Sequence, residues 1–440
     1  MKRPARRSTT RLSARTGHGG APTETVANIR IDSIAAGGDG VGRIDGMACF
    51  VPRTAAGDVA QVAYVPHARY ARGRVLQLLE MSPDRTEPRC HHYVADRCGG
   101  CQLQHLTHEA QRNVRRHIVR DALQRVGRRE VPLPEIVSGI EWEYRERLTL
   151  ALRSRGTNWI GGLHAFDDAG RIFALDECPI AHPRLTACWS DLRRQLRGLP
   201  QPRPGTTLRL SLRLMGNAQV AVVVQGGWDW RDGAPWAAQV HANVALIGAI
   251  WWEPDAGAAV MLSGELNSDV LAFAQVNPVV ATALREHVLT IARSFTPASV
   301  IDAYSGRGEI AESLARDGAR VTAIEADRMA TMRAAERLAE FDAATVITAR
   351  VEDVLADVLP AELVVLNPPR RGVDIRVAAT LAESAPHGVR AIVYVSCDPA
   401  TLARDLSRLP RWRIASVRCF DMFPQTAHVE TVCVLIPENS

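Results

Sequence analysis

The chain has 440 residues, of which 46% are hydrophobic and 23% charged, and its formal net charge at pH 7 is +5. Such a length exceeds what one hydrophobic core usually serves, so about three domains are expected. No apolar run approaches the ~18 residues that a membrane span needs, which excludes a membrane-spanning protein. The nine cysteines, an odd number, and the absence of an apolar signal segment argue against a secreted disulfide framework, and we expect a cytoplasmic protein.

Residues 1–23 are basic and carry no acidic side chain. They include Lys2, the only lysine of the chain, and five arginines, and they have almost no large apolar side chains with which to form a core. We interpret them as a disordered basic tail. A transit peptide is the alternative, although Pro4 and the lack of a Leu/Phe stripe weaken an amphipathic helix. Without the six charges of this tail, the rest of the chain has a net charge of −1.

Residues 24–83 contain short runs of alternating polar and apolar residues, separated by glycine-rich turns. This pattern is typical of a small β-barrel of the OB type. The stretch GGDGVGR at residues 37–43 could be mistaken for a phosphate-binding loop, but no helix follows it. We therefore interpret it as a glycine hairpin that joins two strands.

Residues 84–270 make up the expected central domain. Its segment 106–127 is rich in arginine, and apolar residues recur along it at helical spacing. The remaining faces of this helix are basic, which favours contacts with the phosphates of an anionic partner, while a merely solvated helix surface is the alternative. From about residue 145 the domain is β-rich, and its periodicity alone indicates no chemistry.

Four cysteines of this domain form the pattern Cys90-x7-Cys98-x2-Cys101, with Cys178 farther along the chain. Four thiolates with a C-x2-C pair among them can bind zinc tetrahedrally or ligate an iron–sulfur cluster. The spacing by itself favours neither metal.

From residue 298 onward, hydrophobic strands alternate with helices, which predicts a doubly wound parallel sheet with a ligand at the carboxyl ends of its strands. The first strand ends in the run DAYSGRG, residues 302–308, and the second ends at Glu325. Glycines let a ligand approach the backbone closely, and an acid about twenty residues further on suits a ribose diol. The third glycine of a dinucleotide fingerprint is missing, so S-adenosyl-L-methionine is favoured over NAD.

Later strand ends carry candidate reactive groups. Asn367 ends a strand and precedes two prolines, so that its amide faces the expected cleft. Cys397 ends another strand directly before a helix, whose N-terminus we expect to lower the pKa of the thiol and make it a nucleophile; a buried core cysteine is the alternative. His428 and Glu430 lie just before the last strand, where an acid alone is a weak signal.

Together these motifs resemble those of the S-adenosylmethionine-dependent RNA uracil-5-methyltransferases, and above all the members with an N-terminal TRAM domain and an iron–sulfur cluster. The resemblance runs from about residue 24 to the end. The motifs that carry it are CGGCQLQH at 98–105, FAQVN at 273–277, the glycine turn at 304–308, NPPRRG at 367–372, SCDPATLARDL at 396–406 and HVET at 428–431.

The resemblance implies a multidomain α/β protein in three parts: an OB-like TRAM barrel at 24–83, a central β-rich iron–sulfur domain at 84–270, and a Rossmann-like, doubly wound methyltransferase domain at 271–440. It also implies an enzyme that converts uridine in RNA to 5-methyluridine through a covalent adduct between a cysteine and C6 of uracil. 23S ribosomal RNA is the favoured substrate and tRNA the alternative. We expect a monomer with no membrane partner.

The same resemblance assigns roles to individual residues. It implies a structural [4Fe-4S] cluster rather than zinc, a cysteine nucleophile, a carboxylate base and four contacts to S-adenosyl-L-methionine. In this sequence those positions are Cys90, Cys98, Cys101 and Cys178 for the cluster, Cys397 for the nucleophile, Glu430 for the base, and Gln275, Tyr304, Glu325 and Asn367 for the cofactor.

Three departures from the family pattern stand out. Seven residues separate the first two cluster cysteines where five are usual, Asn367 stands at a position usually occupied by aspartate, and Glu309 stands where many members have asparagine. Asn367 keeps an acceptor oxygen but loses a charge, so we expect weaker contacts there and no loss of function. A non-catalytic RNA-binding or iron–sulfur sensing protein is the alternative from another class, and methylation of DNA or free nucleotides is a third possibility. The presence of both Cys397 and Glu430 argues against the sensor.

Overall fold

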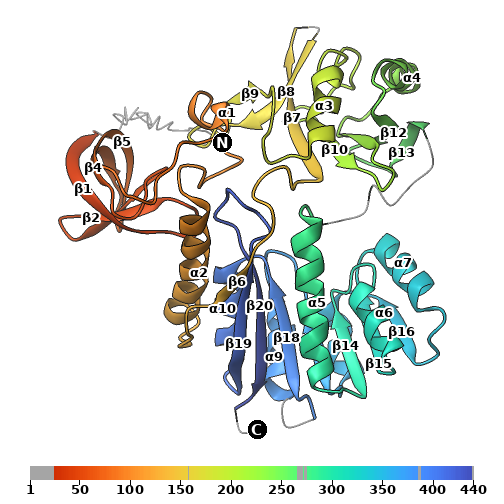
Figure 1. Ribbon diagram of the computed structural model, residues 1–440. Helices are drawn as coiled ribbons and strands as arrows, with labels where there is room; N and C mark the ends of the chain where they lie inside the picture. Colours follow the sequence, from red (N-terminus) through yellow and green to blue (C-terminus); the bar gives the residue numbers. More distant parts are fainter. Residues whose placement is uncertain (1–23, 157, 265–270, 272–274, 385–387, 439–440) are drawn as a thin grey trace, which may run out of the picture.

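The computed structural model of the chain describes residues 24–156, 158–264, 271, 275–384 and 388–438 (Figure 1). The segment interpreted as a basic tail, residues 1–23, lies outside the described residues. Within the part of the chain that is described, none of the helices combines the length and the apolar character required to cross a membrane.

The N-terminal part is a closed barrel of five strands, as the alternating pattern predicts. The strands follow one another around the barrel in the order β1-β2-β3-β5-β4. β1 and β2 pair antiparallel, and Gly38 in the turn between them has a φ of +90°, a backbone conformation that glycine adopts without strain. This confirms the glycine hairpin. The bounds are β1 (Thr25–Ile34), β2 (Gly40–Ile44), β3 (Met47–Val51), β4 (Val59–Pro66) and β5 (Ala71–Glu80).

The central sheet has seven strands in the order β13-β12-β11-β10-β7-β8-β9. Alternate residues of β7, β10 and β11 are leucine or valine, and they form one hydrophobic core with the helices α3 and α4. The bounds are β7 (Arg147–Arg155), β8 (Asn158–His164), β9 (Ile172–Ala174), α3 (Pro183–Leu192), β10 (Arg209–Leu214), β11 (Val220–Gln225), α4 (Gly233–Asn243), β12 (Ile247–Glu253) and β13 (Val260–Gly264).

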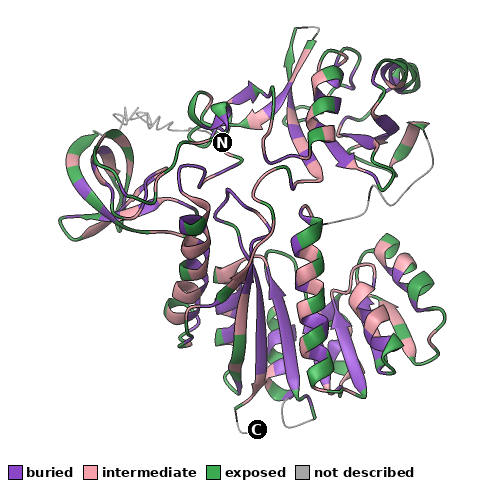
Figure 2. Cartoon of the chain, viewed as in Figure 1, coloured by how far each residue is buried: buried purple, intermediate pink, exposed green. Residues whose placement is uncertain are grey.

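The C-terminal sheet has eight strands in the order β16-β15-β14-β17-β18-β20-β19-β6, and its central strands are buried (Figure 2). The five strands from β16 to β18 are parallel, and β20 is antiparallel to β18. Separate hydrophobic cores lie on its two faces, which confirms the expected doubly wound arrangement. The strand bounds are β6 (Glu135–Val137), β14 (Ser299–Ala303), β15 (Arg320–Glu325), β16 (Ala344–Thr348), β17 (Leu363–Leu366), β18 (Ala391–Ser396), β19 (Trp412–Phe420) and β20 (Glu430–Pro437).

Seven further helices accompany this sheet or precede it. α5, α6 and α7 lie together on the right of Figure 1, and α10 packs against α2 on the left. Residues of α2, α9 and α10 contribute to one and the same hydrophobic core of the sheet. The bounds are α2 (His108–Arg125), α5 (Pro278–Ser294), α6 (Glu309–Arg316), α7 (Arg328–Leu338), α8 (Val351–Val358), α9 (Ile375–Ser384) and α10 (Pro399–Ser407), and the short α1 (His91–Val94) lies at the first cysteine.

The arginine-rich helix α2 packs on the C-terminal sheet, although the sequence places it in the central segment. Val119 and Leu123 belong to the hydrophobic core of that sheet, and β6, which follows α2, pairs with β19. Arg115 is fully buried, and its guanidinium donates to the carboxylate of Asp421 at 2.8 Å. The expectation that the polar side of this helix is a uniform phosphate-binding face is therefore wrong for Arg115, because this arginine neutralises an interior carboxylate.

Breaking this ion pair should destabilise the protein strongly. Neither side chain is exposed to solvent, so Arg115→Ala leaves the carboxylate of Asp421 buried without its guanidinium, and among the described residues only His108, at 3.1 Å, remains as a side-chain partner. We expect the free energy of unfolding to fall by about 3–5 kcal/mol, measured by urea denaturation followed through tryptophan fluorescence. The control is Arg125→Ala on the same helix, whose side chain is 81% exposed. Equal stability of the two variants would contradict a stabilising role for the buried ion pair between Arg115 and Asp421.

Candidate active site and four-cysteine site

The candidate active site lies at one edge of the C-terminal sheet. Tyr304, Asn367 and Cys397 directly follow or nearly follow the parallel strands β14, β17 and β18, so the carboxyl ends of these strands bring them to the same edge. β20 runs the opposite way, and its pairing of Thr431 with Ser396 places Glu430 next to Cys397. Residues between 30 and 126 positions apart in the sequence thus meet at one edge because of the directions of their strands.

The turn after β14 has a left-handed backbone, which its two glycines adopt without strain and Tyr304 does not. Tyr304, Gly306 and Gly308 have positive φ angles of 61°, 55° and 75°. A Cβ built on Gly306 would meet no atom within 4 Å, so there is open space above the turn. The carboxylate of Glu325 accepts a hydrogen bond from the Gly306 N–H at 3.1 Å and so lies beside that space.

Asp302 lies beneath the same turn and is buried. It accepts a hydrogen bond from the N–H of Ala311 at 3.2 Å, at the start of α6. Burial raises the pKa of Asp302 to about 7, and the negative charge of Glu325 raises it further. No pattern in the sequence assigns a role to Asp302, because its burial follows from the packing of α6 on β14.

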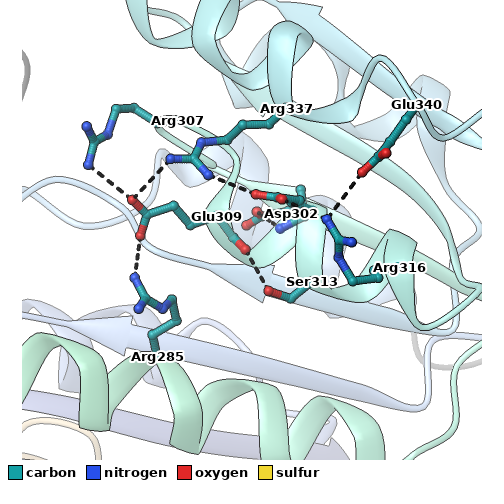
Figure 3. A network of polar contacts seen from close by, with 10 residues as sticks. Arg285, Asp302, Arg307, Glu309, Ser313, Arg316, Arg337 and Glu340 are labelled. Atoms are coloured by element: carbon teal, nitrogen blue, oxygen red, sulfur yellow. Dashed lines mark hydrogen bonds and ion pairs between the residues drawn. The ribbon is translucent and has the colours of Figure 1, made fainter. Parts of the chain in front are cut away.

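Glu309, one of the departures from the family pattern, is compensated by arginines. It accepts hydrogen bonds from Arg285 of α5 at 2.6 Å and from Arg307 of the glycine turn at 3.0 Å, and Arg337 of α7 lies 4.0 Å away (Figure 3). All four side chains are partly exposed, so each pair is worth about 0–1 kcal/mol. Their joint effect is to tie the glycine turn to the helices on either side of α6.

The environment of Cys397 differs from the one expected. Burial raises the pKa of its thiol, and the charges of Glu430 and Asp398 raise it further, while Arg370 lowers it. The expectation that the N-terminus of α10 lowers this pKa overall is wrong. The main reason is burial of the thiol, and the charge of Glu430 adds to it. Asp398, which caps the helix by accepting from the Thr401 N–H at 2.7 Å, contributes a smaller effect in the same direction.

Glu430 is 4% exposed, and burial raises the pKa of its carboxyl group to about 7. The guanidinium of Arg370 opposes that increase. Arg370 is therefore the cation that faces both reactive groups, and its charge also lowers the pKa of His428. In the sequence, Arg370 stands out only as part of the motif NPPRRG, because its proximity to Glu430 depends on the fold.

The remaining predicted cofactor residues, Asn367 and Gln275, make few of the described contacts. Asn367 is exposed, and its N–H donates to the carbonyl of Ala303 at 3.3 Å. Gln275 is half-buried and lies three residues before α5, next to residues 272–274, which are outside the described part of the chain. The structure thus brings Tyr304, Asn367 and Glu325 to the same sheet edge, and no described contact assigns a partner to the side chain of Gln275.

The four predicted metal ligands line a single cavity of about 260 Å³. Residues of the candidate active site, among them Arg370, Phe423 and His428, line the same cavity. The thiols are free, and burial raises the pKa of each of them, that of Cys98 to about 11. Burial therefore disfavours the thiolates, and a bound cation would oppose this effect by stabilising their negative charge.

The donor set of the four-cysteine site suits a metal centre that binds thiolates. The Gly100 N–H donates to the sulfur of Cys98 at 3.4 Å, a contact that favours a thiolate. Four thiolates can hold a zinc ion or an iron–sulfur cluster, and the lining of the cavity by itself fits either group.

Comparisons with known proteins agree with this geometry. Residues 267–438 match the family model described as tRNA (Uracil-5-)-methyltransferase. The chain is 30% identical to the 23S rRNA (uracil(1939)-C(5))-methyltransferase RlmD of Halomonas elongata, over 92% of this chain and 88% of that protein. It is also 30% identical to RlmD of Thiobacillus denitrificans, over 90% of this chain and 96% of that protein.

Among solved structures, the chain is similar to the Pyrococcus abyssi tRNA (uracil-54, C5)-methyltransferase in complex with S-adenosyl-L-homocysteine. The TM-score is 0.68 with 24% sequence identity, and the match covers 93% of this chain and 99% of that one. The similarity shows that the two proteins share a fold along nearly their whole lengths.

Removing the positive charge of Arg370 should make the Cys397 thiol less acidic. Because Arg370 favours the thiolate, Arg370→Leu raises the pKa of Cys397 and shifts the pH curve of its alkylation by iodoacetamide to higher pH. Mass spectrometry of the peptide that contains Cys397 measures the rate. Arg371→Leu, at the neighbouring position, is the control and should leave the curve in place. An unshifted curve for Arg370→Leu would show that this guanidinium does not act on the thiol.

Proposed function

We infer that this chain, which belongs to the family of RNA uracil-5-methyltransferases, transfers a methyl group from S-adenosyl-L-methionine to C5 of a uracil in RNA through a covalent adduct with Cys397. The observation that carries the proposal is the antiparallel pairing of β18 and β20, which sets a thiol and a buried carboxylate side by side with Arg370 facing both. Membership of an enzyme family also disfavours the non-catalytic alternative.

The glycine turn and its neighbours are the proposed cofactor site. Open space above Gly306 and the carboxylate of Glu325 beside it suit the ribose of a nucleoside, and Tyr304 and Asn367 lie at the same edge. Gln275 is proposed as the fourth contact. When bound, S-adenosyl-L-methionine supplies an electrophilic methyl group. A related fold that holds S-adenosyl-L-homocysteine supports this choice.

The chemistry explains why a thiol and a base are both needed. Uracil C5 is too weak a nucleophile to attack a methyl sulfonium, so the Cys397 thiolate first forms a bond to C6, and the C5–C6 electron pair moves toward O4 as an enolate. C5 then attacks the methyl carbon while the carbon–sulfur bond of the donor breaks. The nearby guanidinium of Arg370 favours the thiolate that starts this sequence.

Glu430 completes the reaction in this proposal. Its carboxylate removes the proton from C5, the C5–C6 double bond re-forms, and the bond between C6 and Sγ breaks to release the Cys397 thiolate. A pKa of about 7 suits a base that must accept and return a proton near neutral pH. Because C6 is inaccessible within a base stack, the target nucleotide must be flipped out to reach the thiol.

The proposed substrate is 23S ribosomal RNA. The relatives named as acting on 23S rRNA are 30% identical to this chain over nine-tenths of its length, whereas the structural neighbour named for tRNA is 24% identical. tRNA remains the alternative substrate. The barrel strands β1 and β5 carry the exposed arginines Arg30, Arg72 and Arg74. Each is paired with a carboxylate at the surface, and we propose that RNA phosphates replace these carboxylates as partners outside the active site.

Cys90, Cys98, Cys101 and Cys178 are the proposed ligands of a [4Fe-4S] cluster. Their common cavity supports a shared metal centre, and the resemblance to the iron–sulfur members of the family favours the cluster over a single zinc ion. Methyl transfer needs no electron, so the role proposed for the cluster is structural. The longer spacing between Cys90 and Cys98 is accommodated by α1, for which Cys90 is the N-cap.

Two variants test the proposed mechanism. Cys397→Ala removes the nucleophile and should reduce transfer of labelled methyl groups to RNA to background, while Glu430→Gln should form the methylated adduct and fail to resolve it. The adduct is detected as a protein–RNA band on a denaturing gel. Cys49→Ala, which removes a buried thiol in the barrel, is the control. Undiminished transfer by Cys397→Ala would refute the mechanism.

Metal analysis tests the proposed cluster. The protein purified without oxygen should be brown, absorb broadly in the visible range and contain about four irons per chain. Cys101→Ser should lose most of that colour and iron, whereas Cys188→Ser, another buried cysteine, should keep both. A colourless protein with one zinc per chain would refute the assignment.

A further inference from the structure

The segment 421–429 leads directly to Glu430 and is held mainly by residues from elsewhere in the chain. Gln425 lies at its centre with a φ of 72°, a left-handed conformation that is unfavourable for glutamine. Such a conformation persists only where surrounding contacts fix it. The contacts that do so come from the four-cysteine site and from α2.

The peptide of Gln425 is bound on both sides. The N–H groups of Gln102 and Leu103, which follow the ligand Cys101, donate to the Gln425 carbonyl at 3.1 and 3.0 Å. On the other side, the Gln425 N–H donates to Oε1 of Gln111 at 2.9 Å, and Nε2 of Gln111 donates to Oε1 of Gln425 at 2.9 Å. Gln111 is 1% exposed, so water does not compete for these bonds.

Neighbouring residues of the segment are held in the same way. The hydroxyl of Tyr144 donates to the carbonyl of Pro424 at 3.0 Å, and Arg115 donates to the carbonyl of Thr426 at 2.7 Å. Tyr144 packs in one hydrophobic cluster with Cys90 and Cys101. The conformation of the segment is therefore set by the cysteine-rich region and by α2.

We propose that Gln111 is a positioning residue for the methyl-transfer reaction: together with the Gln102–Leu103 backbone it fixes Gln425 and thereby holds Glu430 and His428 in place at the cleft. The proposal rests on the proposed function of Glu430 as the base. The Gln102–Leu103 backbone links the four-cysteine site to the active site, because Gln102 directly follows Cys101 and lines the same cavity as His428.

The variant Gln111→Met tests the proposal, since methionine keeps the volume of the side chain but makes neither hydrogen bond to Gln425. We expect kcat to fall about tenfold and the share of enzyme trapped as RNA adduct to rise, because proton removal by Glu430 slows. The Kd for S-adenosyl-L-methionine, measured by calorimetry, should stay within about twofold. Hydrogen exchange of the Gln425 amide, followed by mass spectrometry, should become faster.

Gln124→Met is the matched control on the same helix, because the amide of Gln124 bonds only to the exposed Glu130 among the described contacts. Tyr144→Phe is the second variant, in case Gln111→Met does not fold. It removes the single bond to the Pro424 carbonyl and should raise the adduct share more modestly.

Turnover and an adduct share equal to those of Gln124→Met, in both folded variants, would overturn the positioning role while leaving the mechanism intact. If Glu430→Gln forms no adduct, the proposed function itself fails, and the positioning role fails with it. An adduct that accumulates in Gln111→Met and in Glu430→Gln, but not in Gln124→Met, supports both.

Discussion

The candidate active site depends on one structural constraint, the reversal of strand direction at β20. Parallel strands bring Tyr304, Asn367 and Cys397 to the carboxyl edge of the sheet. If β20 were also parallel, its first residue, Glu430, would lie at the opposite edge. Because β20 is antiparallel and pairs Thr431 with Ser396, its first residue reaches the same edge. The thiol of Cys397 and the buried carboxylate of Glu430 thus become neighbours through backbone hydrogen bonds, which do not depend on the conformation of either side chain.

Loss of contact with water determines the electrostatics of both sites. Burial is the largest influence on the pKa of Cys397, of Glu430 and of the four cavity cysteines, and in every case it favours the neutral form. Local positive charges then decide which group can ionise. Arg370 acts on Cys397 and Glu430, and a bound metal centre would act on the cavity thiols in the same sense. Arg370 and His428 line the cavity of the four cysteines, so this cavity reaches the edge of the candidate active site.

The cysteine-rich region joins the three parts of the molecule. Arg53 of the barrel donates to the carbonyl of Cys98 at 3.0 Å and lies over the rings of Tyr93 and Phe166, at 3.8 and 4.2 Å from their centroids. The same region packs against the central sheet through Cys178, and it binds segment 421–429 through Gln102 and Leu103. A structural metal centre at this junction would therefore orient the barrel relative to the active site and would need no redox chemistry to affect turnover.

The sequence by itself determined the barrel, the alternating strands and helices of the C-terminal sheet and the place of Cys397 at the end of a strand, because local periodicity encodes these features. The spacing of Cys90, Cys98, Cys101 and Cys178 predicted a four-cysteine group, and the structure places all four around one cavity. Tertiary structure decided the rest. It buried Arg115 against Asp421, 306 positions away, and joined Gln111 to Gln425 across 314 positions. It also raised the pKa of Cys397 where the helix N-terminus suggested the opposite. Those outcomes depend on which surfaces pack together and which charged groups are desolvated, and a local pattern of residues predicts neither.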